Sequence, residues 1–344
     1  MPDLLTTGAN AAPASRARWA LAVHGGAGNI ERANFTPEKE AVYRAALLSS
    51  LERGSKLLDA GGPALDAVEA AIRVLEDDAL FNAGRGAVFT ACGCIQLDAA
   101  IMDGATLRAG AVAGVTRTRN PITLARAVME RSPHVMLAGE GAGGFGARLG
   151  VEQVEPAWFF TERRWQELKR TLQKAGRPVP PRPAGVPPEP AGPVLPPLTP
   201  DDANCGTVGA VARDVQGGVA AGTSTGGTTA MLRGRIGDSP LIGAGTYASA
   251  RSCAVSATGI GEYFIRLAAA RDICALVEYK GMTLTAALDE VIQKRLTALG
   301  GSGGAIALTP DGQLAWSFNC PGMYRARQEA DSGPVAAIFE DEPA

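Results

Sequence analysis

A proline-dense segment at residues 176–202 divides the chain and excludes regular secondary structure there. It reads GRPVPPRPAGVPPEPAGPVLPPLTPDD and holds a large share of the 23 prolines. Proline lacks the N–H group that a helix interior or a sheet ladder needs, so such a run forms neither. We predict an extended, solvated linker between a first part ending near residue 175 and a second beginning near residue 204.

Both parts mix predicted strands and helices. The apolar run at 19–23 predicts a buried strand that leads into the turn-rich stretch HGGAGN, and Thr36-Pro37 is typical of a helix start. Further strands are expected near 87–90, 95–102, 109–115, 240–247, 253–258, 305–308 and 314–318, and within the stretches GTVGAVARD at 206–214 and GGVAAGTSTGG at 217–227. Helices are expected at 37–60, 64–75, from 120, and at 141–149, 161–175, 261–279 and 284–298. This order predicts sheets covered by helices, in one sandwich of layers built by both parts.

Composition excludes several classes of function. The 344 residues carry a formal net charge of −2, and the absence of a long run of one sign argues against nucleic-acid or anionic-membrane binding. No apolar stretch is long enough to span a membrane. Residues 1–18 have no apolar core and are expected to be a disordered lead rather than a secretory signal. The six scattered cysteines, including the Cys92-Gly93-Cys94 pair, complete no zinc pattern and indicate reduced thiols in a cytoplasm.

The chain has only two histidines, His24 and His134. A histidine-rich metal site is therefore excluded, and a hydrolase of this sequence needs another base. A threonine at a new N-terminus carries its own base, because an α-amine has a reference pKa of about 7.7–8.0.

Thr207 is the candidate for that nucleophile. It stands in NCGTVGAVARD, where the linker meets an apolar strand. Gly206 before it permits the backbone geometry that an attack by the hydroxyl on the preceding carbonyl requires. The sequence thus suggests self-cleavage of the Gly206–Thr207 bond, although most threonines at strand starts have no such role.

Two other stretches offer groups for substrate. Arg235 and Asp238, three residues apart between glycines, are either a surface ion pair or a clamp for an α-carboxylate and an α-ammonium. Thr258-Gly259 ends an apolar strand just before a helix, where free N–H groups suit an oxyanion. The hydroxyl-rich GTSTGGTT lacks the lysine of a phosphate loop, and the glycines of 139–146 lack the flanks of a dinucleotide fold.

Taken in order, these pieces resemble the isoaspartyl peptidase/L-asparaginase family, the plant-type asparaginases among the N-terminal nucleophile hydrolases. The resemblance covers nearly the whole chain. It includes LAVHGGAG at 21–28, LFNAGRGAVF at 80–89, LDAAIMDG at 97–104, NPITLARAVMERSPHVMLAGEGA at 120–142, GTVGAVA at 206–212, STGG at 224–227, RGRIGDSPLIGAGTYA at 233–248, ATGIGE at 257–262 and FNCPGMYRA at 318–326.

The resemblance implies an α+β fold, the four-layer αββα sandwich, formed by a precursor that cuts itself. Residues 19–206, with the linker at 176–204, would become the α subunit and 207–344 the β subunit, both within one domain. Two processed precursors would assemble as an (αβ)2 dimer. The implied substrates are asparagine and isoaspartyl dipeptides, with no nucleic acid and no membrane as partner.

The family pattern also implies roles for single residues. Thr207 resembles the nucleophile and Thr225 its hydroxyl partner, whereas Thr258 and Gly259 resemble the oxyanion hole. His24 resembles part of a structural glycine loop. The remaining substrate contacts implied are Arg235, Ile236, Gly237, Asp238, Ile260, Gly261 and Asn82. The resemblance implies no cofactor for catalysis. It does imply a structural sodium ion, held by the main-chain carbonyls of Leu75, Glu76, Asp78, Phe81, Ala83 and Arg85.

Ile260 departs from the pattern, because a small or hydroxyl residue is common there. Three alternatives stay open at this point: a glycosylasparaginase of the same fold, a threonine-type endopeptidase of the family, and a binding relative that never cleaves itself. Glycosylasparaginases are typically secretory or lysosomal. Because no signal peptide is recognised in this sequence, the glycosylasparaginase alternative is not favoured.

Overall fold

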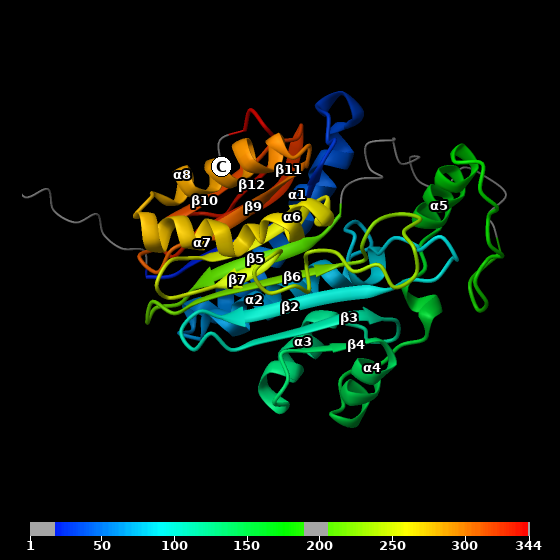
Figure 1. The fold of residues 1–344 in the computed structure, drawn as a ribbon, viewed down its shortest axis with the longest axis horizontal. Coiled ribbons are helices and arrows are strands. Elements are labelled where there is room, and N and C mark those ends of the chain that lie inside the picture. Colours follow the sequence, from blue (N-terminus) through cyan, green and yellow to red (C-terminus); the bar gives the residue numbers. More distant parts are fainter. Residues whose placement is uncertain (1–17, 189–205, 343–344) are drawn as a thin grey trace, which may run out of the picture.

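The computed structural model describes residues 18–188 and 206–342 (Figure 1). The expected lead at residues 1–17 and the second half of the expected linker, residues 189–205, lie outside the described residues. In the described ranges, no helix is long and apolar enough to cross a membrane.

The larger sheet is built by both parts of the chain. Its eight described strands run in the order β12-β11-β1-β5-β6-β2-β3-β4. The central strand β1 pairs with β5 from the second part of the chain and with β11 from its end. The bounds are β1 Ala20–Gly28, β2 Leu97–Asp103, β3 Ala109–Val115, β4 Met136–Ala138, β5 Val208–Arg213, β6 Val219–Thr225, β11 Gly322–Glu329 and β12 Val335–Phe339.

A four-stranded antiparallel sheet packs against it in the order β10-β9-β8-β7. The two sheets meet through β1 and β9 and through β5, β6 and β8. Alanines dominate this interface, among them Ala22, Ala221 and Ala254, all buried. Such short side chains let the two sheets approach closely. The bounds are β7 Thr246–Ala248, β8 Ala254–Gly259, β9 Gly303–Leu308 and β10 Leu314–Phe318.

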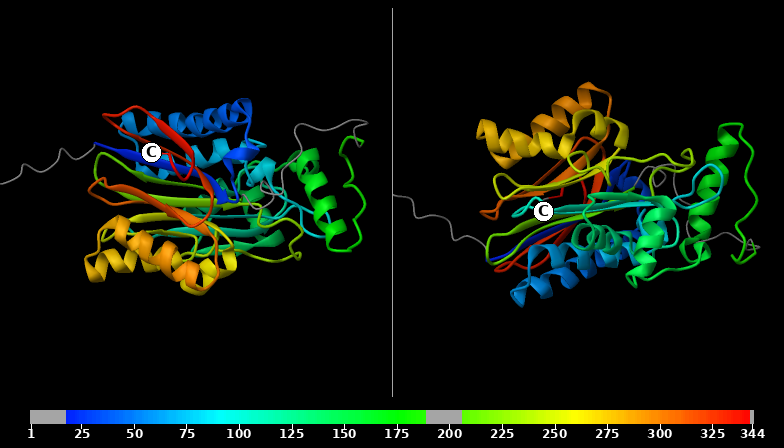
Figure 2. Two further views of the ribbon diagram at one scale, coloured as in Figure 1. Left: turned by 90° about the horizontal axis from the view of Figure 1, so that it is seen from above. Right: turned by 60° about the horizontal axis from the view of Figure 1, so that its bottom comes forward.

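Helices cover the two outer faces, which completes the expected four-layer order (Figure 2). On the larger sheet, Leu47 of α1, Ile72 of α2 and Ile122 of α3 enter one core with Leu21 and Val23 of β1. The smaller sheet buries its outer face against α6, α7 and α8. The bounds are α1 Pro37–Asp59, α2 Ala64–Asp77, α3 Pro121–Arg131, α4 Gly139–Arg148, α5 Glu162–Lys174, α6 Gly261–Leu267, α7 Ala269–Lys280 and α8 Leu284–Asp289.

Several expected boundaries are wrong. Strand β1 continues through the HGGAGN stretch to Gly28, because β11 pairs with it across a bulge between His24 and Gly26. Residues 87–90 form no strand, since their backbone bonds go to loops, as in Ala230 N–H to Phe89 O at 2.8 Å. Of 240–247, only the end is strand. The helix expected at 261–279 breaks at Ala268, which has φ +49°, and the one at 284–298 becomes α8 followed by a π-helical stretch, Glu290–Leu296.

The described half of the linker has no helix or strand, as expected, but it is not free in solvent. Arg182 forms an ion pair with Glu162 of α5 at 2.5 Å, and its guanidinium lies 4.6 Å from the centre of the Phe160 ring. Pro180 packs beside Gly93. Residues 177–188 therefore fold back along α5 before the chain leaves the described region.

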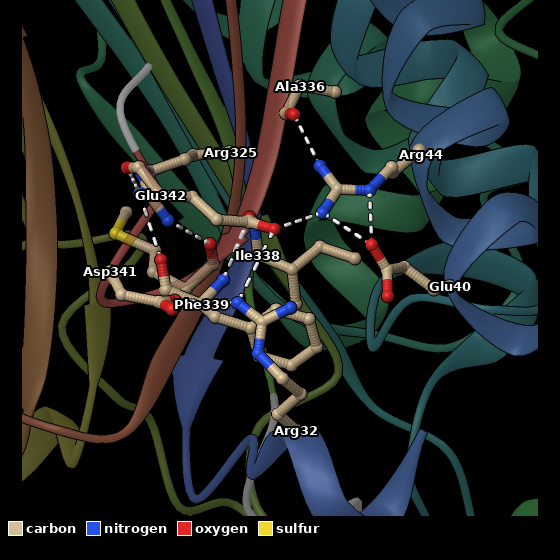
Figure 3. A network of polar contacts seen from close by, with 10 residues as sticks. Arg32, Glu40, Arg44, Arg325, Ala336, Ile338, Phe339, Asp341 and Glu342 are labelled. Carbon is tan, nitrogen blue, oxygen red and sulfur yellow. Dashed lines mark hydrogen bonds and ion pairs between the residues drawn. The ribbon is translucent and has the colours of Figure 1, made fainter. Parts of the chain in front are cut away.

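A C-terminal turn fastens β12, a strand that the sequence did not predict, to α1 (Figure 3). The Glu342 carboxylate accepts the N–H groups of Ile338 at 2.6 Å and Phe339 at 3.2 Å, and it pairs with Arg44 of α1. Burial works to raise the pKa of Glu342, but these hydrogen bonds outweigh it, so the pKa lies below its usual value.

We expect Glu342→Ala to lower the free energy of unfolding by about 1–3 kcal/mol, because the N–H groups of Ile338 and Phe339 lose their acceptor and Arg44 loses one of its partners. Since the folded pKa is depressed, this stability is present above the unfolded pKa and is lost as the pH falls through the folded pKa. Urea unfolding at pH 7 and in the acid range should show the difference shrink with acid. Glu340→Ala, a neighbouring exposed carboxylate, is the control; equal losses from both would contradict a specific role for Glu342.

Candidate active site

Antiparallel pairing of β5 with β6 brings Thr207 and Thr225 together. Val208 lies opposite Ser224 in the register, so Thr207 enters β5 beside the end of β6. The Thr207 hydroxyl donates to Thr225 Oγ1 at 3.0 Å, and both side chains are buried. Thr225 in turn accepts the Gly227 N–H at 3.0 Å, which fixes its orientation. The predicted nucleophile and its hydroxyl partner are therefore in hydrogen-bond contact.

The backbone at Thr207 is strained. Its φ is +135°, which a β-branched residue rarely adopts. Strain of this kind costs on the order of 1–3 kcal/mol. Gly206 is equally constrained, because an added Cβ there would lie 2.3 Å from Asn82 Nδ2. The strain thus falls on the residue whose preceding peptide bond is the predicted cleavage site.

The end of β8 supplies a donor to the same bond. Thr258 donates its hydroxyl to the carbonyl oxygen of Gly206 at 3.3 Å and accepts the Ala27 N–H at 3.3 Å. Gly259, with φ +152°, passes so close to Ser302 that an added Cβ would lie 2.4 Å from its carbonyl oxygen. Of the two residues predicted for an oxyanion hole, Thr258 therefore contacts the predicted scissile carbonyl, and Gly259 lines the same cavity as Gly206.

Arg235 and Asp238 lie next to each other against Gly261. An added Cβ on Gly261 would lie 2.8 Å from Asp238 Oδ1 and 3.1 Å from Arg235 Nη2. Asp238 is buried, and its Oδ2 has no hydrogen-bond partner among the described residues. Burial raises the pKa of Asp238 to about 7 although Arg235 opposes the shift. A buried carboxyl with a free oxygen is suited to receive an ammonium group.

Sequence reasoning missed the residue that holds Arg235. Glu262 forms a two-point pair with it, Arg235 Nε to Oε1 at 2.9 Å and Nη2 to Oε2 at 2.8 Å. Sequence reasoning also missed a buried carboxylate, Asp98 of β2. It accepts the Gly114 N–H at 2.7 Å, and burial raises its pKa to about 6. Glu262 stands in the ATGIGE stretch and Asp98 in the LDAAIMDG stretch. Their place in these stretches was the signal by which sequence reasoning could have found them.

A cavity of about 540 Å³ opens over these groups. Three of the predicted substrate contacts, Asn82, Arg235 and Ile260, are among its lining residues. Thr207 is only 4% exposed and lies beneath the lining. Four of the predicted substrate contacts, Ile236, Gly237, Asp238 and Gly261, are not among the lining residues. Ile236 is 37% exposed, whereas the other three are buried beside Arg235. Lining residues that the sequence did not single out are Ala27, Asn29, Thr228, Met231, Leu232, Glu262, Ser302, Asn319, Cys320 and Pro321.

A protein-family model described as asparaginase matches residues 17–338. The chain belongs to this asparaginase family.

Relatives of the asparaginase family match over nearly their whole length. An isoaspartyl peptidase of Escherichia coli K12 is 49% identical over 93% of this chain and 96% of its own length. A probable isoaspartyl peptidase/L-asparaginase of Arabidopsis thaliana is 43% identical over 94% and 99%. A plant-type L-asparaginase of Pyrococcus abyssi is 40% identical over 93% and 99%. This chain is similar to all three.

His24 in this asparaginase is a buried neutral residue. It is fully buried, and burial lowers its pKa to about 3. Its Nε2 lies 2.9 Å from Ser256 Oγ, which lies 2.7 Å from Thr223 Oγ1. These contacts join β1, β8 and β6 beneath Thr207. His24 is thus structural, as predicted, but it belongs to a strand and not to a loop.

Residues 75–86 hold the main-chain carbonyls for which the family resemblance implies a sodium ion. An added Cβ on Gly84 would lie 2.2 Å from Glu76 O, and one on Gly86 would lie 1.9 Å from Phe81 O. The Glu76 carboxyl faces away and accepts the Ser224 hydroxyl at 2.7 Å. Carbonyl oxygens crowded around two glycines are the ligand type of a hard cation. The residues fit the ion.

Glu262→Ala should raise KM for an α-amino-acid substrate by up to about fivefold with kcat unchanged, because a half-exposed ion pair contributes about 0–1 kcal/mol. KM rises because Arg235 loses the partner that holds its side chain in place before substrate binds. Steady-state kinetics measures the split. Glu290→Ala, which breaks surface pairs with Lys294 and Arg295 directly after α8, is the control. An equal fall in kcat would mean that Glu262 itself contacts the reacting atoms.

Proposed function

We propose that this protein is a self-processing amidohydrolase with Thr207 as its nucleophile. It hydrolyses the side-chain amide of asparagine and the β-aspartyl bond of isoaspartyl dipeptides and releases aspartate. The observation that carries the proposal is the arrangement around one peptide bond. The Thr207 hydroxyl lies 3.0 Å from Thr225 Oγ1, the Thr207 backbone is strained, and Thr258 donates to the Gly206 carbonyl. The printed names of the relatives support the substrate class.

In self-processing, the Thr207 oxygen attacks the Gly206 carbonyl carbon. The acyl group moves from nitrogen to oxygen, and the hydroxyl proton ends on the freed amine. Water then hydrolyses the ester, which leaves Gly206 as a carboxylate and Thr207 as a new N-terminus. Thr258 stabilises the oxygen on which negative charge develops. The strain at Thr207 favours the shift because cleavage releases it.

In turnover, Arg235 binds the α-carboxylate of the substrate and Asp238 its α-ammonium. The Thr207 amine takes the proton of its own hydroxyl, which attacks the side-chain carbonyl. Thr258 and the N–H of Gly259 stabilise the oxyanion; one such donor contributes about 3–4 kcal/mol. Ammonia or an amino acid leaves with the proton, and water hydrolyses the β-aspartyl ester.

Three further properties belong to the proposal. The processed chains assemble as an (αβ)2 dimer in the cytoplasm, where the free thiols of the described cysteines stay reduced. A sodium ion is held by the main-chain oxygens of the loop after α2, namely Leu75, Glu76, Asp78, Phe81, Ala83 and Arg85. The ion would supply a fixed charge that stiffens this loop, which carries Asn82 to the cavity.

The test is release of aspartate from three substrates: asparagine, a β-aspartyl dipeptide and glycosylated asparagine. We expect turnover of the first two. Preference for the glycosylated substrate would replace the proposal with a glycosylasparaginase. Binding of aspartate by an uncut chain that turns over nothing would replace it with a binding relative.

A further inference from the structure

The loop that carries Arg235 and Asp238 has no regular secondary structure of its own. Residues 226–245 belong to no helix or strand. Gly234 within it has φ +88°, a conformation that glycine adopts without strain. Two side chains that bind the two α groups of one substrate must be kept at a fixed spacing by their surroundings. The backbone of this loop therefore depends on contacts from outside it.

Gln96, the residue directly before β2, holds one end of the loop. Its side-chain oxygen accepts the Gly234 N–H at 2.8 Å. The Gln96 side chain is half-buried, and its Nε2 would lie 3.3 Å from a Cβ added to Gly114 of β3. Gln96 thus bridges β3 and the residue that precedes Arg235.

A β-bulge in the pairing of β2 with β3 accommodates Asp98, two residues after Gln96. The register shifts within 97–99, where two residues of β3 lie opposite Asp98 alone. One of them is Gly114, with φ +64°, whose N–H donates to Asp98 Oδ1 at 2.7 Å. Bulges of this kind redirect side chains and are common beside active sites. The bulge thus fixes the orientation of a carboxylate that is only 3% exposed.

Asp98 contacts the other end of the loop. Burial raises the pKa of its carboxyl, whereas the positive charge of Arg235 and a hydrogen bond from the Gly237 N–H act against the rise. Gly237 in turn packs on Arg235, because an added Cβ there would lie 2.8 Å from Arg235 Nη1. Gln96 and Asp98 therefore hold the backbone before and after Arg235.

We propose that Gln96 and Asp98 are positioning residues that fix the loop of residues 234–238 in its binding conformation before substrate arrives. Neither residue is among those that line the cavity, so both act through the loop and not by touching substrate. A loop that is already ordered loses less conformational freedom on binding, which strengthens affinity. The inference rests on the proposed binding role of Arg235 and Asp238 and extends it to the start of β2.

The first experiment measures by calorimetry how tightly the full chain and its variants bind aspartate, which carries both α groups. Gln96→Ala should raise the Kd by about threefold to tenfold, the effect of one hydrogen bond. Gln96→Glu keeps an acceptor oxygen and should stay within about twofold of wild type. Asp98→Ala should raise the Kd by about tenfold or more, because hydrogen bonds to a charged group are stronger.

The control is Asp103→Ala at the far end of β2, whose carboxylate accepts the Ala105 N–H in a surface turn and should not affect the Kd. Asp98→Ala also removes a buried acceptor. If that variant does not fold, the Gln96→Ala and Gln96→Glu pair decides the proposal. Equal Kd values in wild type and Gln96→Ala overturn it, as does failure of the wild type to bind aspartate.

Two further readouts separate positioning of the loop from damage to the nucleophile. Self-cleavage before Thr207 needs no substrate, so intact mass spectrometry should show Gln96→Ala cut to the same extent as wild type; a loss of cleavage overturns the proposal. With a β-aspartyl dipeptide, KM of Gln96→Ala should rise while kcat stays constant. If the wild type binds aspartate but turns over no substrate, the proposed function fails, and the Kd values still decide the role of Gln96 and Asp98.

Discussion

Thr207→Ala should yield a single uncut chain with no measurable hydrolysis of asparagine or β-aspartyl dipeptides. Removing the nucleophile of a hydrolase lowers kcat by about 10⁶-fold in comparable cases. Here the same oxygen is proposed to perform both self-cleavage and turnover, so both should be lost together. Intact mass spectrometry after incubation near neutral pH reads out cleavage, and aspartate release reads out turnover.

Two variants make this result specific. Thr207→Ser keeps a hydroxyl at the same position and should still be cut. Cleavage of this variant would show that Thr207→Ala fails because it lacks the hydroxyl and not because it misfolds. Thr283→Ala removes the hydroxyl that caps α8, where it accepts the Ala286 N–H, and should cost stability without affecting cleavage. A Thr207→Ala protein that cuts itself before residue 207 and turns over substrate would end the proposal.

Asp238→Asn should lower kcat/KM by at least about a hundredfold, mainly through KM. Removing one partner of a buried ion pair costs about 3–5 kcal/mol, because the other charge is left uncompensated. In the proposed complex that charge would be the α-ammonium of the substrate, and Oδ2 of Asp238 has no hydrogen-bond partner among the described residues. The control is Asp272→Asn on α7, which breaks the ion pair of Asp272 with Arg295 and should leave KM unchanged.

The pH profile gives the same residue a second test. Burial raises the pKa of Asp238 to about 7, so its carboxylate is charged above pH 7 and is lost as the pH falls through that value. The Thr207 amine must also be unprotonated, with a reference pKa of about 7.7–8.0. Wild-type kcat/KM should therefore fall more steeply with acid than that of Asp238→Asn, which retains only the amine. Identical profiles would mean that Asp238 does not bind the ammonium group.

Local sequence predicted most helices because their signals lie within a few residues. The Thr36-Pro37 start and the spacing of Val68, Ile72 and Leu75 each became a helix at the expected place. The strand β11 was missed because its MYRARQE run looks polar. Only pairing with β1 on one side and β12 on the other buries it.

Sequence by itself determined the family, the order of its segments and the candidate residues of the site, because each depends on neighbours along the chain. Tertiary structure decided which of them meet. The 3.0 Å contact of Thr207 with Thr225, the donation from Thr258 to Gly206 and the two-point hold of Glu262 on Arg235 join segments far apart in sequence. Strand register and the approach of the two sheets create these contacts, and neither is encoded in any local spacing. The strain at Thr207 has the same origin, since a φ of +135° is imposed on a β-branched residue only by what surrounds it.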